Sequence, residues 1–104
     1  MLIRKPVVAG QFYPSETEDL KNMIKYCIEH KYGPGNQLTE TREKVYGIIC
    51  PHAGYVYSGP TACHSYKSIL SQTPELALII GPNHIGIGRD EATTIDAQRQ
   101  TPLG

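Results

Sequence analysis

The hydrophobic positions in the first third of the chain repeat with the period of an α-helix. Apolar side chains recur at i, i+3, i+4, i+7 and i+8, which places one stripe on a single helical face: Leu20, Met23, Ile24, Cys27 and Ile28. Ser15 and Glu18 have the spacing of a capping box, and Gly33, Pro34 and Gly35 supply a stop. The pattern predicts a helix that begins after Ser15 and packs this stripe into a core.

Two short apolar runs without alternation predict buried strands further along the chain. They cover residues 45–49, before Pro51, and residues 76–80, before Pro82. Proline cannot donate to a sheet ladder, so each strand is expected to stop there. A strand covered on both faces is typical of a parallel sheet. Residues 2–9 predict a further strand, which Pro6 restricts to the edge of the sheet. Residues 92–95 predict a last short strand.

A second helix is expected between the two apolar runs, starting at Ser58 to Pro60, because proline suits a first helical turn. Its inward face would hold Ala62, Cys63, Tyr66, Ile69 and Leu70. A strand, a helix and a strand in this order form a unit with parallel strands. The predicted fold class is therefore α/β, with a central, mostly parallel sheet and flanking helices.

Residues 1–104 are expected to form one single but incomplete domain. A sheet of two or three strands leaves edges unpaired and one face thinly covered. We therefore expect the chain to be the N-terminal part of a larger α/β domain, or to complete its sheet by assembling with another chain, as in a homo-oligomer.

Charge and composition exclude several classes of partner. Ten Lys plus Arg balance ten Asp plus Glu, so there is no charge argument for nucleic acid or an anionic membrane surface. No apolar run approaches the roughly 20 residues of a membrane span, and the first residues lack the apolar core of a signal peptide. A cytoplasmic protein is expected. Three cysteines without a C-x-x-C pair indicate reduced thiols.

Two histidines follow the two predicted strand ends. His52 and His84 would emerge at the same edge of the sheet, because the carboxyl ends of parallel strands face one way. Imidazole nitrogens suit zinc, copper or iron, so the two rings could share one ion. Glycine and aromatic residues nearby are expected to shape a pocket: Gly10, Phe12, Tyr13, Tyr55 and Tyr57.

Two ligands do not complete a catalytic metal site, which usually takes three protein ligands. The acidic residues after His84 are candidates that nothing in their spacing selects: Asp90, Glu91 and Asp96. Cys50 shares a face with His52 if the strand stays regular, which leaves a nucleophilic hydrolase as an alternative. However, Cys50 ends an apolar run without a cationic neighbour, which favours an inert thiol. His64 is interpreted as a surface or packing residue.

Five motifs in order along the chain resemble the Memo family, whose prokaryotic members are called AmmeMemoRadiSam system protein B. The motifs are Arg4-x-Pro6-x-x-Ala9-Gly10-x-Phe12-Tyr13-Pro14, Pro51-His52-Ala53-Gly54-Tyr55-x-Tyr57-Ser58-Gly59, Ala62-x-His64-x-Tyr66, Gly81-Pro82-Asn83-His84 and Thr101-Pro102-Leu103-Gly104. The resemblance covers the whole chain, and the second and fourth motifs are the specific ones.

The resemblance implies an α/β fold similar to class III extradiol dioxygenases, whose metal is non-haem iron. His52 and His84 match the two family histidines that bind a metal, copper or iron, in a pocket. The family's third ligand, a cysteine near its C-terminus, and a further His and Asp have no counterpart in this sequence. The implied function is that of a metal-binding oxidoreductase or dioxygenase-like protein whose substrate is not fixed; the alternative is a non-catalytic ligand- or peptide-binding scaffold that uses the same pocket. The implied partners are an AMMECR-type protein and a radical SAM protein.

Overall fold

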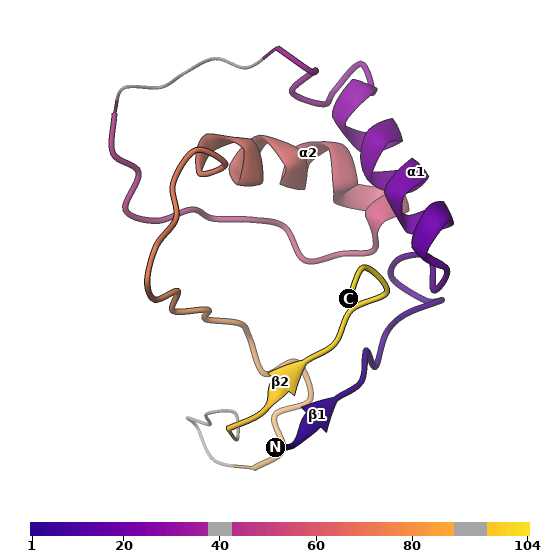
Figure 1. Ribbon diagram of the computed structural model, residues 1–104, viewed down its shortest axis with the longest axis vertical. Helices are drawn as coiled ribbons and strands as arrows, with labels where there is room; N and C mark the ends of the chain where they lie inside the picture. The colour runs from indigo at the N-terminus through magenta and orange to yellow at the C-terminus, as the bar shows by residue number, and fades with distance from the viewer. Residues whose placement is uncertain (38–42, 89–95) are drawn as a thin grey trace.

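The computed structural model describes residues 1–37, 43–88 and 96–104. Within these ranges the chain forms β1 (Ile3–Arg4), α1 (Thr17–Glu29), α2 (Tyr55–Ser68) and β2 (Gln98–Arg99) (Figure 1). β1 and β2 pair in parallel, with Ile3 opposite Gln98 and Arg4 opposite Arg99. The α/β class with a parallel sheet is confirmed, and β1 lies inside the expected edge strand at residues 2–9.

α1 forms where the apolar stripe predicts it. Leu20 and Cys27 from that stripe are 3% and 1% exposed and make up the fully buried hydrophobic core of the described residues. The capping box is wrong, because the cap is Glu16 and its side chain makes no capping bond. The acidic Glu18 and Asp19 lie in the first turn, where their negative charges interact favourably with the positive end of the helix dipole.

The chain reverses after α1 as the glycines of residues 33–35 suggest. His30 caps the helix, and the Gly35 N–H donates to the Ile28 carbonyl at 2.8 Å. Gly35 has φ +71°, a left-handed value that glycine adopts without strain. The predicted stop is therefore confirmed, and its mechanism is a backbone bond closed by a glycine.

α2 begins at Tyr55, three residues before the expected start at Ser58. Gly54 is the cap, and its carbonyl accepts the N–H groups of Tyr57 and Ser58 at 2.9 and 3.2 Å. Pro60 consequently lies inside the helix, where its missing N–H leaves the Val56 carbonyl without the usual helical donor. The expected inward face is partly wrong, since Tyr66 and Leu70 are 59% and 69% exposed.

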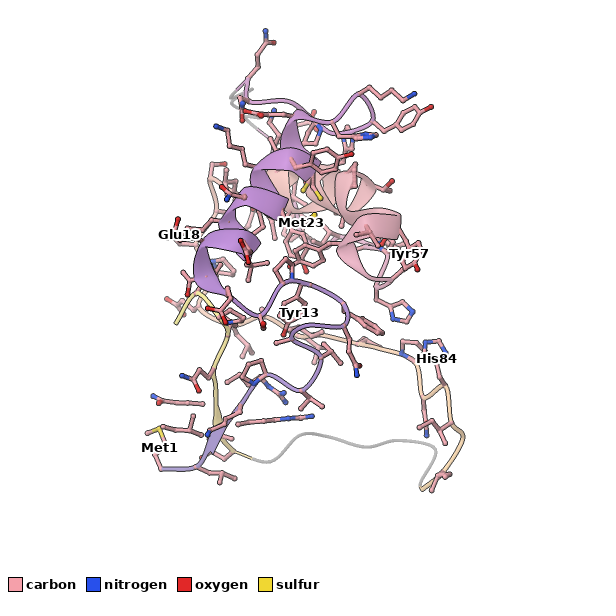
Figure 2. The ribbon with its side chains drawn as sticks, turned by 90° about the vertical axis from the view of Figure 1, so that its right-hand side faces the viewer. Met1, Tyr13, Glu18, Met23, Tyr57 and His84 are labelled. Atoms are coloured by element: carbon pink, nitrogen blue, oxygen red, sulfur yellow. The ribbon has the colours of Figure 1, made fainter. Side chains whose placement is uncertain are left out.

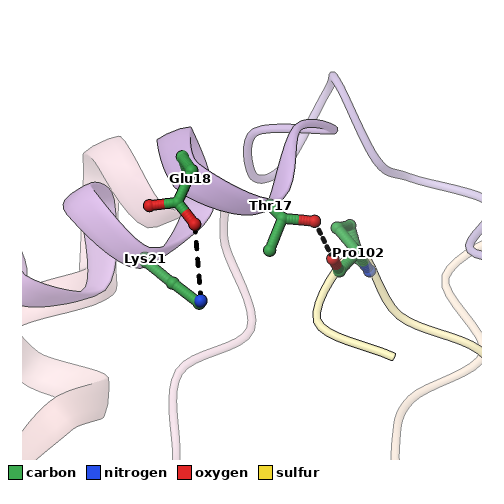
Figure 3. A network of polar contacts seen from close by, with 4 residues as sticks. All are labelled: Thr17, Glu18, Lys21 and Pro102. Atoms are coloured by element: carbon green, nitrogen blue, oxygen red, sulfur yellow. Dashed lines mark hydrogen bonds and ion pairs between the residues drawn. The ribbon is translucent and has the colours of Figure 1, made fainter.

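The two helices meet through a small residue. Gly59 of α2 is buried, and a Cβ placed on it would lie closer than 3.0 Å to Cys27 Sγ of α1. Glycine therefore sets how closely α2 approaches α1. At the other end of α1, Thr17 Oγ1 donates to the Pro102 carbonyl, so the turn at residues 101–104 lies beside the start of the helix (Figure 3).

The predicted strands at residues 45–49 and 76–80 are wrong for the part of the chain that the structure describes. Neither run belongs to a strand. Ile49 and Ile79 are 97% and 90% exposed, whereas Val45 and Ile48 of the first run are half-buried. A strand needs a neighbour to bond its backbone, and these runs have no ladder partner among the described residues. The expected strand at residues 92–95 lies outside the described residues.

The chain is open rather than closely packed. Its accessible surface is 9436 Å², whereas a compact monomer of this mass has roughly 5,800 Å². The radius of gyration is 15.3 Å, against about 13 Å for a compact domain of similar length. Neither α1 nor α2, the helices of the described residues, has the length and apolarity needed to cross a membrane.

Candidate functional site

The structure brings together the two histidines that follow the apolar runs. The Nε2 atoms of His52 and His84 lie 3.3 Å apart, their ring centroids are 4.9 Å apart, and the ring planes differ by 14°. Both side chains are exposed. Figure 2 shows His84 on a segment that lies away from α1. The ends of the two runs therefore converge although the runs themselves form no sheet.

Short hydrogen-bonded turns hold each histidine. Ser58 Oγ of α2 donates to the carbonyl of Ala53, directly after His52, at 3.3 Å. Asn83, directly before His84, donates from Nδ2 to the Ile87 carbonyl at 3.1 Å and accepts the Gly86 N–H at 3.0 Å. Asn83 thus closes the turn with its side chain, as asparagine often does.

The two Nε2 atoms lie within hydrogen-bonding distance of each other. A hydrogen bond between two Nε2 atoms requires one to carry a proton and the other to accept it. A metal ion bound to both nitrogens would need both to be free of a proton, because ligating nitrogens must be deprotonated.

A small cavity lies next to the segment that carries His52. Its volume is about 220 Å³, and four of the five expected pocket residues line it: Gly10, Phe12, Tyr13 and Tyr55. Gln11, Pro14, Met23 and Val56 complete the lining. Tyr57 is 84% exposed and is not among these residues. The cavity is therefore formed by the turn at residues 10–14, the start of α2 and one side chain of α1.

Backbone contacts tie that turn to the histidine segment. Gly10 has φ +86°, and its N–H donates to the Tyr13 carbonyl at 2.7 Å. The Tyr55 N–H donates to the Phe12 carbonyl at 2.8 Å, three residues after His52. The rings of Tyr13 and Tyr55 are 5.7 Å apart at 45°. Burial raises the pKa of the Tyr55 phenol, with smaller contributions from Tyr66 and Tyr13, so it remains a neutral donor.

The cysteines do not form a nucleophilic site with the imidazoles. Cys50 Sγ contacts the neighbouring Pro51 carbonyl at 3.4 Å, while His52 Nε2 is engaged by His84. Burial raises the pKa of the Cys27 thiol, and burial followed by the other two cysteines raises the pKa of Cys63. Both therefore stay protonated at neutral pH, which disfavours nucleophilic attack and metal binding by them.

Other candidate ligands stand apart from the pair. Asp90 and Glu91 lie outside the described residues, and Asp96 is exposed. Among the residues that the structure places, no three His, Cys, Asp or Glu side chains gather as a metal site. His64 Nε2 lies 2.8 Å from the Tyr32 carbonyl, which gives this histidine a packing role between α2 and the loop after α1.

Sequence reasoning missed the residues that orient the site. Asn83 and Ser58 hold the two histidine turns, and Met23 contributes to the cavity wall. The signal for Asn83 was its place between Pro82 and His84, because asparagine favours turns. Met23 was assigned only to the helical stripe, since periodicity does not reveal which part of a stripe meets a loop.

The chain is similar to known proteins over almost its whole length. Residues 4–104 match the family model described as Memo-like protein. A MEMO1 family protein of Nitrosopumilus maritimus is 63% identical over 103 residues, covering 99% of this chain and 37% of the relative. MEMO1 family proteins of Methanopyrus kandleri and Methanocaldococcus jannaschii are 50% and 46% identical, covering 97% and 98% of this chain and 37% of each relative.

The chain therefore spans little more than a third of the length of these relatives, and it matches their N-terminal portion. No solved structure matches it. Because the family model covers nearly every residue, the chain belongs to the Memo-like protein family.

Proposed function

We propose that His52 and His84 bind one redox-active metal ion, copper or iron, and that the family-length protein is a metal-dependent oxidoreductase of dioxygenase-like chemistry. The observation that supports this most strongly is the 3.3 Å separation of the two Nε2 atoms. The two nitrogens belong to residues 32 positions apart in sequence, so their approach is a property of the fold.

The separation suits shared coordination. Two nitrogens bound at 2.0–2.1 Å to one ion with a tetrahedral angle lie about 3.4 Å apart. The rings are stacked with their planes 14° apart, whereas an ion lies in the plane of each ring that binds it. One ring must therefore rotate about its side-chain bonds when an ion binds. Because both side chains are exposed, little packing opposes that rotation.

The chain's own residues would bind the metal ion and orient a substrate beside it. His52 and His84 would supply the two nitrogens, and the turns closed by Ser58 and Asn83 would hold them in place. Copper or iron held there would supply one-electron chemistry. Tyr55, whose pKa is raised by burial, would present a protonated hydroxyl in the adjoining cavity. A substrate of small size would be positioned there by the aromatic walls.

Metal binding is tested by equilibrium dialysis against Cu(II) and, under nitrogen, Fe(II), with metal analysis of the protein. His52→Ala and His84→Ala are each expected to weaken binding by about tenfold or more, since the loss of even an outer-shell partner of a metal ligand typically costs that much. His64→Ala is the matched control, since His64 is also exposed and also bonded through Nε2. Equal metal content in the wild type and both site variants would contradict the proposal.

A second candidate is a binding module without turnover, and the cavity favours it. Four of the five expected pocket residues surround a space of about 220 Å³, enough for a small aromatic ring, and the described residues hold no third metal ligand beside the pair. Phenol binding measured by saturation-transfer NMR is expected to survive His52→Ala and His84→Ala and to be lost in Tyr55→Ala. Oxygen uptake that depends on both histidines would favour the oxidoreductase instead.

The family resemblance also supports proposals about context. We propose that the family-length protein is cytoplasmic and associates with an AMMECR-type protein and a radical SAM protein. We also propose that it associates with itself. Size-exclusion chromatography of the purified proteins, alone and mixed, measures each of these complexes. Independent elution at all concentrations would contradict them.

A further inference from the structure

An open groove lies on one face of α1, next to the small cavity. Its residues from the helix recur at i, i+3, i+4 and i+7, which places them on a single face: Asp19, Asn22, Met23 and Tyr26. The volume of the groove is about 550 Å³. Pro14 and Met23 line both the groove and the cavity of about 220 Å³, so the two spaces share a wall. Figure 2 shows Met23 on α1 next to the turn that carries Tyr13.

The two spaces differ in their chemistry. The cavity has aromatic walls from Phe12, Tyr13 and Tyr55, and the described residues that line it carry no charge. Such walls suit an uncharged aromatic ring. The groove adds the carboxylate of Asp19 and the amide of Asn22, whose oxygens accept N–H donors. A ligand that fills both spaces therefore needs a ring at one end and an N–H donor at the other.

The Asp19 carboxylate is available to such a donor. Asp19 is exposed, and the ion pair found among the described residues joins its neighbour Glu18 to Lys21 instead. Tyr26, which is 60% exposed, presents an aromatic ring to the groove, and a cation over a tyrosine ring is attracted by its π-electrons. The described lining of both spaces includes no cationic side chain, so an anion would meet only repulsion from Asp19.

We propose that the cavity and the groove together bind an arylalkylamine, a small molecule whose aromatic ring is joined to a primary ammonium group by a short carbon chain. The ring would occupy the aromatic cavity, and the ammonium would donate to Asp19 and to Asn22 Oδ1. Side chains at i and i+4 of a helix are about 5–6 Å apart, so a short carbon chain reaches from beside Met23 to Asp19. This ligand class rests on the second candidate function, the binding module, because the ring occupies the same cavity.

Three probes with the same phenol ring and different charges test the ligand class. Tyramine is a cation, para-ethylphenol is neutral, and para-hydroxyphenylpropionate is an anion. Their dissociation constants are measured by NMR titration of the metal-free protein at neutral pH, which keeps the result independent of metal binding by His52 and His84. Tyramine is expected to bind about fivefold more tightly than para-ethylphenol, since an exposed ion pair and a cation–π contact each contribute modestly. The anion is expected to bind most weakly.

Two substitutions that remove the same charge locate the ammonium group. Asp19→Asn is expected to reduce the affinity for tyramine to that for para-ethylphenol, which should itself be unchanged. Glu18→Gln is the matched control, because Glu18 precedes Asp19 in the same helical turn but pairs with Lys21, and it should keep the preference for tyramine.

Three results would overturn the proposal: equal affinities of the wild type for tyramine and para-ethylphenol, a preference for tyramine that survives Asp19→Asn, or an equal loss of preference in Glu18→Gln. Binding of para-ethylphenol without a preference for tyramine would overturn the ligand class alone. If none of the three probes binds, the second candidate function fails together with it.

Discussion

The contact between Gly59 and Cys27 permits a quantitative test of how the two helices pack. A Cβ added at Gly59 would lie closer than 3.0 Å to Cys27 Sγ and 3.4 Å from Cys27 Cβ. Cys27 is 1% exposed, so its short side chain has little room to move away. Replacing Gly59 by alanine therefore forces α2 and α1 apart or drives Cys27 into another rotamer.

Two effects of opposite sign decide the outcome. Overpacking in a filled core costs about 1–3 kcal/mol, whereas alanine favours the interior of a helix over glycine by about 1 kcal/mol. The steric cost is expected to win, and Gly59→Ala should destabilise the fold by about 1 kcal/mol. For a chain of this size that corresponds to a fall of about 4–8 °C in the thermal midpoint.

Circular dichroism at 222 nm during heating measures the midpoint. Gly47→Ala is the matched control, because a Cβ at Gly47 meets nothing within 4 Å. Combining Gly59→Ala with Cys27→Ala should recover about 0.5 kcal/mol or more relative to the sum of the single changes, because the clashing sulfur is removed. A midpoint that rises in Gly59→Ala, or additive single and double variants, would refute the close approach of the helices.

Three further predictions concern protonation, a polar clamp and thiol access. Burial raises the pKa of Cys27 and Tyr55 above their ordinary values of 9.0 and 10.0, so the stability contributed by their neutral forms is complete below pH 9 and is lost as pH rises through the raised values. Thermal midpoints measured from neutral to strongly alkaline pH should therefore fall at the alkaline end, and less steeply in Cys27→Ala. A midpoint that increases at alkaline pH would contradict this prediction. Lys67 Nζ donates to the carbonyls of Pro34 and Gly35 at 3.3 and 3.0 Å, so Lys67→Met should lower the free energy of unfolding by about 1–2 kcal/mol and speed proteolysis near residue 35. The control Lys21→Met breaks only an exposed pair with Glu18 and should lower the free energy of unfolding by less than about 0.5 kcal/mol. Equal rates of proteolysis in the two variants would argue against a stabilising role of the Lys67 hydrogen bonds. Iodoacetamide should alkylate the half-buried Cys50 before the 1% exposed Cys27, as followed by peptide mass spectrometry, and the reverse order would show that the α1–α2 contact opens readily.

Local patterns predicted the helices more reliably than the sheet. The stripe from Leu20 to Ile28 fixes α1, because a helix satisfies its own backbone and needs only one neighbour for its apolar face. Residues 76–80 have the composition of a strand, yet a strand depends on hydrogen bonds to other segments. In the structure this run is exposed and belongs to no strand, because no segment among the described residues pairs with its backbone.

The start of α2 was predicted three residues too late. Pro60 favoured a start near Ser58, but the carbonyl of Phe12, from a distant turn, accepts the Tyr55 N–H and the helix begins there. Such a contact between segments far apart in sequence leaves no mark on local periodicity. The same holds for the start of α1, where Thr17 binds the Pro102 carbonyl.

The candidate site was predicted from spacing, and its geometry came from the structure. Placing His52 and His84 after two apolar runs led to the expectation that their rings would converge, and their Nε2 atoms are 3.3 Å apart. The pairing of β1 with β2, rather than of the two runs, could not be foreseen because it joins residues 3–4 to residues 98–99. Tyr57 was expected beside the pocket, but the earlier start of α2 turns it outward, 84% exposed.

Pulsed electron paramagnetic resonance of the protein with one equivalent of Cu(II) tests the central proposal most directly, since it counts the imidazoles bound to the ion through their remote nitrogens. Two coordinated imidazoles are expected in the wild type and in His64→Ala, and one in His52→Ala and in His84→Ala. A wild-type signal from a single imidazole, or two imidazoles remaining in either site variant, would show that the paired rings do not share a metal ion.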